Sequence, residues 1–479
     1  MSKNSIKKNY IYNLVYQILI LVLPLITTPY VSRVLGAGNI GIYSYTYSIA
    51  TYFILFGSLG IAMYGQREIA YVRDNIEKKS RTFWEIILLR LITMSISLLI
   101  YYFLFVNGTE YQLYYKILII EIIGNILDIS WFFQGLEEFK KTVLRNTLVK
   151  IASVACIFIF VKNANDLPIY VLIMVLSVFL GNITLWFYLP KYLVKVKNIK
   201  IKKHLKPTLA LFIPQIAMQV YTVLDKTMIG NITGDMTEVG NYEQSQKIVR
   251  ISMTVVTSLG TVVSPRIANV ISNGKVEEVK NYLANSFKFV WFLGIPIVFG
   301  LIAVSSDLVP WFLGDGYDKS KMLIMIGSLL VLAIGLNNVT GVQYLIPAKK
   351  QNIYTKSVII GAIFNFVLNM CLIPYFKANG AIVASVLAEF TILIVQIYYV
   401  RNTIDNKMIF NNAFKYLIGG IIMFIATLLE GIFMPSSIIT TIVQVITGII
   451  IYGIFLLIIK DEYVYIILNK LKETIGGNK

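Results

Sequence analysis

Apolar runs of about 20 residues follow one another along most of the chain, and they limit its fold more than any other feature. They begin at Tyr10 and continue to Ile459 with short connections between them. A helix of this length crosses about 30 Å of hydrocarbon, and a helix satisfies its own backbone hydrogen bonds in lipid. Mean hydropathy is +0.71 and only 14% of the 479 residues are charged. The chain is therefore predicted to be an all-α polytopic membrane protein with about fourteen transmembrane helices.

Lysine and arginine are distributed unevenly between alternate connections. About 32 of the 43 lie in the N-terminal segment, the C-terminal tail and one alternating set of loops, and about six lie in the other set. Under the positive-inside rule, this bias places both termini in the cytoplasm. The net charge of +18 is thus a topology signal. We expect no nucleic-acid partner, and we expect the basic loops to contact anionic membrane lipids.

Two halves of the chain repeat each other. At an offset of 199 residues, Gly41, Tyr43 and Arg67 match Gly240, Tyr242 and Arg266. We predict a six-helix lobe at 1–190, a basic cytoplasmic connector at 191–207, a second six-helix lobe at 208–401, and two additional helices with a cytoplasmic tail at 402–479. The lobes are predicted to be related by a pseudo-twofold axis along the membrane normal, a transporter plan in which substrate binds between the halves.

Polar side chains also recur in equivalent spans. Asn13 and Gln17 lie four residues apart, as do Gln215 and Gln219, so each pair shares one helix face. Such residues are expected to face protein or a polar path rather than lipid. Hydrogen bonding between helices explains any one of them as well as a substrate path does.

Charged residues within the spans are concentrated between Phe212 and Arg250. Asp225 and Lys226 are adjacent, and Glu243, Lys247 and Arg250 follow one face of the next span at spacings of four and three. Each charge costs about 2.5–3.5 kcal/mol at a membrane centre. One interpretation is a neutralised ion-pair cluster that joins the two helices.

The interpretation that we favour is a cationic cavity for an anionic head group. Lysine and arginine donate hydrogen bonds that match phosphate oxygens, and Arg90 and Arg33 are candidates for the opposite wall. Asp128 and Glu389 are carboxylates in other spans and, with Asp225, Glu243 and the four polar residues above, are candidates for lining the cavity or coupling an ion.

Other classes of site find little support. Cys156 and Cys371 lie in apolar runs, which disfavours a disulfide framework or a cysteine-based metal site. The lone His204 lies in a basic loop and is expected to be a bystander rather than a metal ligand. A membrane enzyme such as a glycan polymerase needs a catalytic surface, and the short outer loops present no carboxylate pair or histidine site.

Several motifs resemble a known family. The segments PYVSRVLG at 29–36, GIYSY at 41–45, GSLG at 57–60, YGQREIA at 64–70, LDKTMIG at 224–230 and GNYEQ at 240–244 are similar to those of Wzx-type polysaccharide flippases of the multidrug/oligosaccharidyl-lipid/polysaccharide exporter superfamily. The resemblance covers essentially the whole chain. Lys226 stands where relatives often have arginine, which keeps the charge but loses the bidentate geometry.

This resemblance implies a non-enzymatic, multi-pass transporter of the bacterial plasma membrane. It would flip undecaprenyl-diphosphate-linked oligosaccharides by alternating access for capsule, O-antigen or similar glycans, with polysaccharide polymerase machinery as an expected partner. No cofactor is expected, and a proton or sodium gradient is the candidate driving force. The alternative is an ion-coupled multidrug or organic-cation exporter of the same superfamily, which Asp128 and Glu389 keep open.

Overall fold

The structure is a computed structural model of the full-length chain, and it describes residues 3–401 and 403–465. Throughout these residues all regular elements are helical. Ten helical segments of the described chain are long and apolar enough to cross a membrane. The prediction of an all-α polytopic membrane protein is confirmed.

Two of these segments contain a break. Helix α1 (Lys3–Ser58) is interrupted at Gly36, whose φ of 75° and ψ of 167° are not helical, and α13 (Gln351–Val400) is interrupted at Lys377. Each half is long enough to span a bilayer. Dividing these two segments at their breaks adds two spans to the ten, and α6 (Phe139–Phe160) and α8 (Leu205–Thr233) add two more. The described helices are therefore consistent with the fourteen predicted spans.

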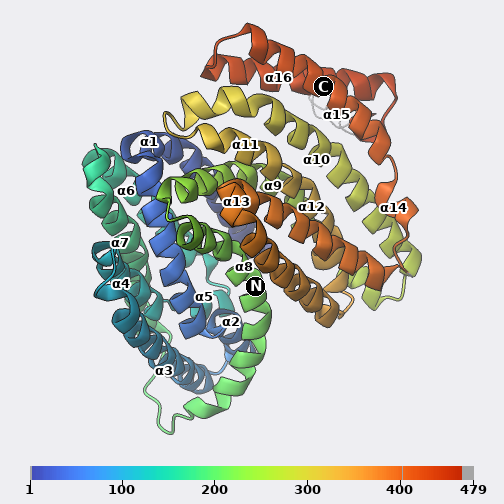
Figure 1. The fold of residues 1–479 in the computed structure, drawn as a ribbon. Coiled ribbons are helices and arrows are strands. Elements are labelled where there is room, and N and C mark those ends of the chain that lie inside the picture. Colours follow the sequence, from blue (N-terminus) through green and yellow to red (C-terminus); the bar gives the residue numbers. More distant parts are fainter. Residues whose placement is uncertain (1–2, 402, 466–479) are drawn as a thin grey trace. The chain divides into compact units, whose positions relative to one another are not determined.

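The chain forms two compact units, Met1–Gly240 and Asn241–Lys479. In the first, α1 lies at the centre and packs against α3, α4, α6 and α8 (Figure 1). The other elements of this unit are α2 (Ile61–Val72), α3 (Ile76–Tyr101) with a π-helical turn at Tyr102–Val106, α4 (Gln112–Ile126), α5 (Ser130–Gly135), α7 (Leu167–Trp186) and the first residues of α9 (Met236–Ser272).

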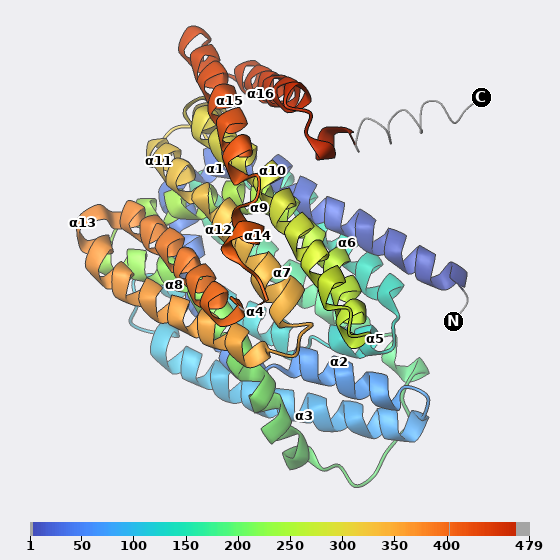
Figure 2. The same cartoon turned by 90° about the vertical axis from the view of Figure 1, so that its right-hand side faces the viewer.

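In the second unit α10 (Val276–Phe312) is the central helix. It packs against α11 (Asp318–Gly327), α12 (Leu329–Asn337), α14 (Asn406–Phe410), α15 (Ala413–Phe433) and α16 (Ile438–Ile458). A π-helical segment, Asn338–Leu345, follows α12, and α13 packs against both. The pair α15 and α16, predicted as an addition to the repeat, lies along α10 (Figure 2).

A close crossing of α1 and α9 joins positions that the repeat makes equivalent. A methyl group added at Gly41 would lie 2.6 Å from the carbonyl carbon of Met236 and 3.0 Å from Gly240 N. One added at Gly240 would lie 2.8 Å from the carbonyl carbon of Ala37 and 3.1 Å from Gly41 N. The backbones of α1 and α9 therefore meet here without intervening side chains, and glycine is required at both positions.

The boundary between the compact units falls at Gly240, beyond the predicted connector at 191–207. The reason is that α8 packs on α1: the Phe56 and Phe212 rings lie 5.8 Å apart and Tyr52 Oη lies 3.0 Å from Thr227 Oγ1. The first helix of the predicted second lobe therefore belongs to the first compact unit. The division into repeats at 1–190 and 208–401 stays a prediction.

Candidate functional site

Lys226 lies on a polar face of α8. Its side chain is half-buried, and Gln219, seven residues earlier and on the same face, is exposed. The adjacent Asp225 points about 100° away and is buried, 4% exposed. The side chain of Gln215, also predicted for this face, lies outside the part of the chain that the structure describes.

A stripe of polar side chains follows α9 through the second unit. Exposed or half-buried positions recur at steps of three and four residues, which is one face of a helix. We call this the α9 stripe, and its members are Glu243, Lys247, Arg250, Thr254, Ser258 and Thr261. At 1.5 Å per residue the stripe is about 27 Å long, close to the thickness of a hydrocarbon core.

The charges of the α9 stripe are only partly neutralised by one another. Lys247 Nζ lies 3.6 Å from Glu243 Oε1, with both side chains partly exposed, so the predicted pair is present. Arg250 is exposed, and within the described residues its guanidinium forms no ion pair. The ion-pair interpretation therefore explains Glu243 and Lys247 but gives no account of Arg250.

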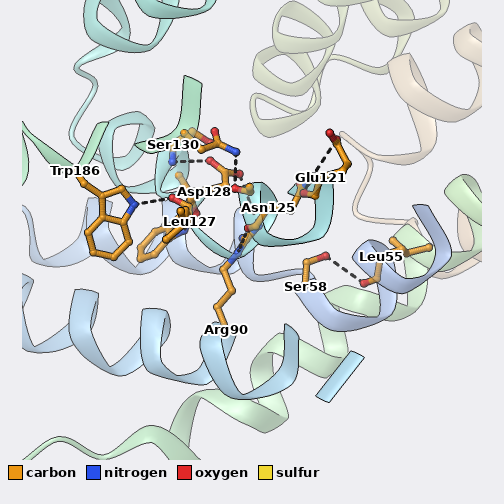
Figure 3. A network of polar contacts seen from close by, with 12 residues as sticks. Leu55, Ser58, Arg90, Glu121, Asn125, Leu127, Asp128, Ser130 and Trp186 are labelled. Atoms are coloured by element: carbon orange, nitrogen blue, oxygen red, sulfur yellow. Dashed lines mark hydrogen bonds and ion pairs between the residues drawn. The ribbon is translucent and has the colours of Figure 1, made fainter. Parts of the chain in front are cut away.

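Arg90 lies inside the first unit, between α3 and α4 (Figure 3). It is 3% exposed, and its Nε and Nη2 donate to the backbone carbonyl of Asn125 at 2.9 and 2.7 Å. Because carbonyls in the last turn of a helix lack intrahelical partners, the guanidinium caps α4. Its Nη1 has no hydrogen-bond partner among the described residues. A role for Arg90 in substrate binding stays a prediction.

The two candidate carboxylates outside α8 and α9 are engaged with protein groups. Asp128 lies 3.8 Å from Arg90 Nη2 and accepts the Ser130 N–H at 2.9 Å. Glu389 is buried, and its Oε2 accepts a hydrogen bond from Asn337 Nδ2 at 2.6 Å. Neither arrangement presents an open acidic site to an organic cation.

The remaining candidates lie on α1. Arg33 is exposed and precedes the break at Gly36. Asn13 and Gln17 belong to the first half of this helix, and their side chains lie outside the described part of the structure. The described residues contain no group of three or more His, Cys, Asp or Glu side chains placed to hold a metal ion.

A buried polar cluster around Glu85 escaped the sequence analysis. Glu85 on α3 is 0% exposed; its Oε2 lies 3.0 Å from His204 Nε2 and 2.7 Å from Lys203 Nζ, and its Oε1 accepts the Lys200 N–H at 2.8 Å. His204 Nδ1 lies 2.7 Å from the Tyr64 hydroxyl on α2. The expectation that His204 is a bystander is wrong, because both of its ring nitrogens are engaged. We call this cluster the connector clamp, since it holds the segment between α7 and α8 against α2 and α3.

Comparisons with known proteins were consistent with one another. A model described as polysaccharide biosynthesis protein matches residues 6–271, and a model described as MatE matches residues 210–371. A protein of Escherichia coli (strain K12) named "Putative O-antigen transporter" is 26% identical over 417 residues, which cover 85% of this chain and 99% of that protein.

Two solved structures share the fold. The structure of lipid II flippase MurJ in an inward closed conformation matches with a TM-score of 0.76 at 16% identity, over 95% of this chain and 100% of that chain. An inward-facing multidrug resistance MATE family transporter of the MOP superfamily matches with a TM-score of 0.61 at 11% identity, over 79% and 94%. At these identities the matches establish the fold alone.

Proposed function

Since the chain belongs to the polysaccharide biosynthesis protein family, we propose that it is a flippase that moves lipid-linked oligosaccharides across a membrane. The sequence resemblance to Wzx-type flippases is confirmed by this membership and by the similarity to the Escherichia coli protein. The relatives compared are transporters, which agrees with a non-enzymatic role. A polyprenyl diphosphate, undecaprenyl diphosphate in particular, is the proposed lipid carrier.

The α9 stripe is the observation that carries this proposal. A charged side chain that faces lipid at the membrane centre costs about 2.5–3.5 kcal/mol, yet Arg250 is exposed on a membrane-spanning helix. A water-filled path removes that cost. Lys247 and Thr254 lie one helical step before and after Arg250, and Glu243 and Ser258 lie one step further. All four are polar, as a path of this kind requires.

The charges fit the head group of the proposed substrate. Lys226, Lys247 and Arg250 supply ammonium and guanidinium donors, and hydrogen bonds between ionised partners are about twice as strong as neutral ones. A diphosphate offers several acceptor oxygens, whereas the glycan is bound by weaker polar contacts. We assign Lys226, Lys247 and Arg250 to the diphosphate, with Arg90 and Arg33 as further cations.

The direction of transport follows from the proposed topology. The positive-inside rule places both termini in the cytoplasm of a bacterial cell, so movement from the inner to the outer leaflet of the plasma membrane is proposed. Coupling to a proton or sodium gradient, and delivery to polysaccharide polymerase machinery, are parts of the same proposal. Export of organic cations is disfavoured because Asp128 and Glu389 are engaged with Arg90 and Asn337.

The test of this proposal measures the amount of surface glycan in cells that lack their own copy of this protein and express a variant in its place. Lys226→Ala and Arg250→Ala should each abolish glycan export while the amount of protein in the membrane stays normal. The control is Lys275→Ala, which removes an exposed cation paired with Glu278 at 3.3 Å and should export like wild type. Wild-type export by both cavity variants would overturn the assignment.

A further inference from the structure

A cavity of about 590 Å³ opens at one end of the first unit, where three segments distant in the sequence meet. They are the part of α1 that follows the break at Gly36, the segment preceding α4, and the turn between α8 and α9. In the predicted topology all three lie on the side opposite the basic loops, where a flipped substrate leaves. The cavity lining includes Asn39, Glu110, Tyr111 and Asp235.

The lining of this outer cavity is rich in hydrogen-bond acceptors. Glu110 and Asp235 contribute carboxylates, Asn39 an amide, and Tyr111 an aromatic ring, while the lining residues that the structure describes include no Lys, Arg or His. Hydroxyl groups that donate to carboxylates form short, strong hydrogen bonds, and a tyrosine ring offers a flat apolar face beside a polar tip. This combination suits the alternating hydroxyl and C–H surfaces of a sugar, whereas it repels a phosphate.

The side chains that line the cavity are held in place by their neighbours. Asp235 Oδ1 accepts the Thr237 N–H at 2.9 Å, and Asn39 Nδ2 donates to the Ala164 carbonyl at 2.8 Å. Within the described residues Asp235 Oδ2 accepts no hydrogen bond. Binding groups fixed before the ligand arrives lose little entropy on binding.

The aromatic wall is equally well supported. The Tyr111 ring packs edge-on against Tyr45 with centroids 6.2 Å apart, and the Tyr45 hydroxyl donates to Asn231 Oδ1 at 2.5 Å. Burial, followed by the hydrogen bond to Glu110, raises the pKa of Tyr111 to about 12. The phenol is therefore neutral at physiological pH and orients the Glu110 carboxylate.

The volume of the cavity fits a glycan better than a single ion. Sites for small organic ligands typically measure about 300–1,000 Å³, and a single cation would leave most of this volume empty. We propose that the outer cavity is a glycan-binding site, in which Glu110 and Asp235 accept hydrogen bonds from sugar hydroxyls and Tyr111 stacks on a sugar ring. This inference rests on the proposed function and assigns the sugar portion of the substrate to the first compact unit.

The test measures binding of the glycan without its lipid. The probe is the repeat-unit oligosaccharide released by mild acid from the lipid-linked pool of the host, and the protein is the full chain in nanodiscs. Saturation-transfer NMR and a Kd titration should detect binding by wild type. Glu110→Ala and Asp235→Ala should each weaken it about ten- to a hundredfold, the value of a hydrogen bond to a charged group. Asp315→Ala, at an exposed position between α10 and α11, should leave Kd unchanged.

A second measurement keeps this inference separate from the proposed function. The same wild-type preparation is tested for movement of the intact lipid-linked oligosaccharide in proteoliposomes. If wild type moves the lipid-linked oligosaccharide but does not bind the released glycan, the glycan site is overturned and the flippase proposal is unaffected. Equal Kd values for wild type, Glu110→Ala and Asp235→Ala would lead to the same conclusion. No movement by wild type overturns the flippase. If either alanine variant is unfolded, Glu110→Gln and Asp235→Asn replace them, with a severalfold loss expected.

Discussion

Replacing Gly41 with alanine should strongly destabilise the first unit. The added methyl group would lie 2.6 Å from the carbonyl carbon of Met236, about 1 Å inside the 3.5–4.0 Å of an ordinary carbon contact. The opposing atoms belong to the backbone of α9 and cannot turn away as a side chain would. Overpacking costs about 1–3 kcal/mol, and we expect about 3 kcal/mol here because two helix backbones must separate.

Thermal unfolding of the purified protein measures this effect through tryptophan fluorescence. A loss of about 3 kcal/mol should lower Tm by about 6–12 °C for a unit of this size. Gly240→Ala, the equivalent substitution in the repeat, should do the same. Gly453→Ala is the matched control, because nothing lies within 4 Å of its added methyl group and alanine favours a helix by up to about 1 kcal/mol. A Tm for Gly41→Ala equal to that of the control would refute the close crossing.

Three further predictions concern the connector clamp, the end of α16 and the α9 stripe. Glu85→Gln should cost about 1.5–3 kcal/mol, since it removes the charge of a buried hydrogen-bond acceptor, and should speed trypsin cleavage at 191–207; Glu77→Gln, whose pair with Arg81 is exposed, is the control, and equal cleavage of both variants would argue against the clamp. Burial of Asp461 opposes ionisation, but hydrogen bonds from Lys415, Tyr416 and the Tyr463 N–H hold its pKa below the usual range, so its contribution to stability is present above about pH 4 and is lost as pH falls further. The Tm difference between wild type and Asp461→Asn should therefore be constant from pH 8 to 6 and shrink below about pH 4; a difference that grows at low pH would contradict this. Glu243→Gln should change Tm little, because a partly exposed pair four residues apart is worth about 0.2–0.5 kcal/mol; misfolding would favour the ion-pair interpretation.

The helical architecture was predictable because hydrophobic length is a local property. Each span needs only its own 20 or so apolar residues, so the spans could be counted without knowledge of their partners. The breaks at Gly36 and Lys377 fall in the short connections between predicted spans, so the hydropathy pattern alone places them. At Lys377 the chain turns back on itself, since Gln396 Nε2 donates to Ser357 Oγ across the two halves of α13. Gly41 and Gly240, which the predicted repeat pairs, meet at a close backbone crossing that tolerates only glycine at both positions.

The candidate site was predictable only where its residues share a helix. Glu243, Lys247 and Arg250 follow one another at helical spacing, and Thr254, Ser258 and Thr261 continue the same series, so the whole polar face is readable from the sequence. Arg90 could not be placed because its partner is the backbone carbonyl of Asn125, which any residue would supply. The connector clamp could not be predicted either, since Tyr64, Glu85 and His204 meet only through tertiary packing.

The central claim is that cations exposed on α9 handle an anionic lipid head group in a polar path. The most direct test is the rate at which purified protein in proteoliposomes moves a polyprenyl-diphosphate-linked oligosaccharide between leaflets. Arg250→Ala should lose at least tenfold in rate, the value of about 1.4 kcal/mol, Arg250→Lys should retain part of the activity, and Lys275→Ala should match wild type. An Arg250→Ala protein that moves the substrate at the wild-type rate would contradict the account.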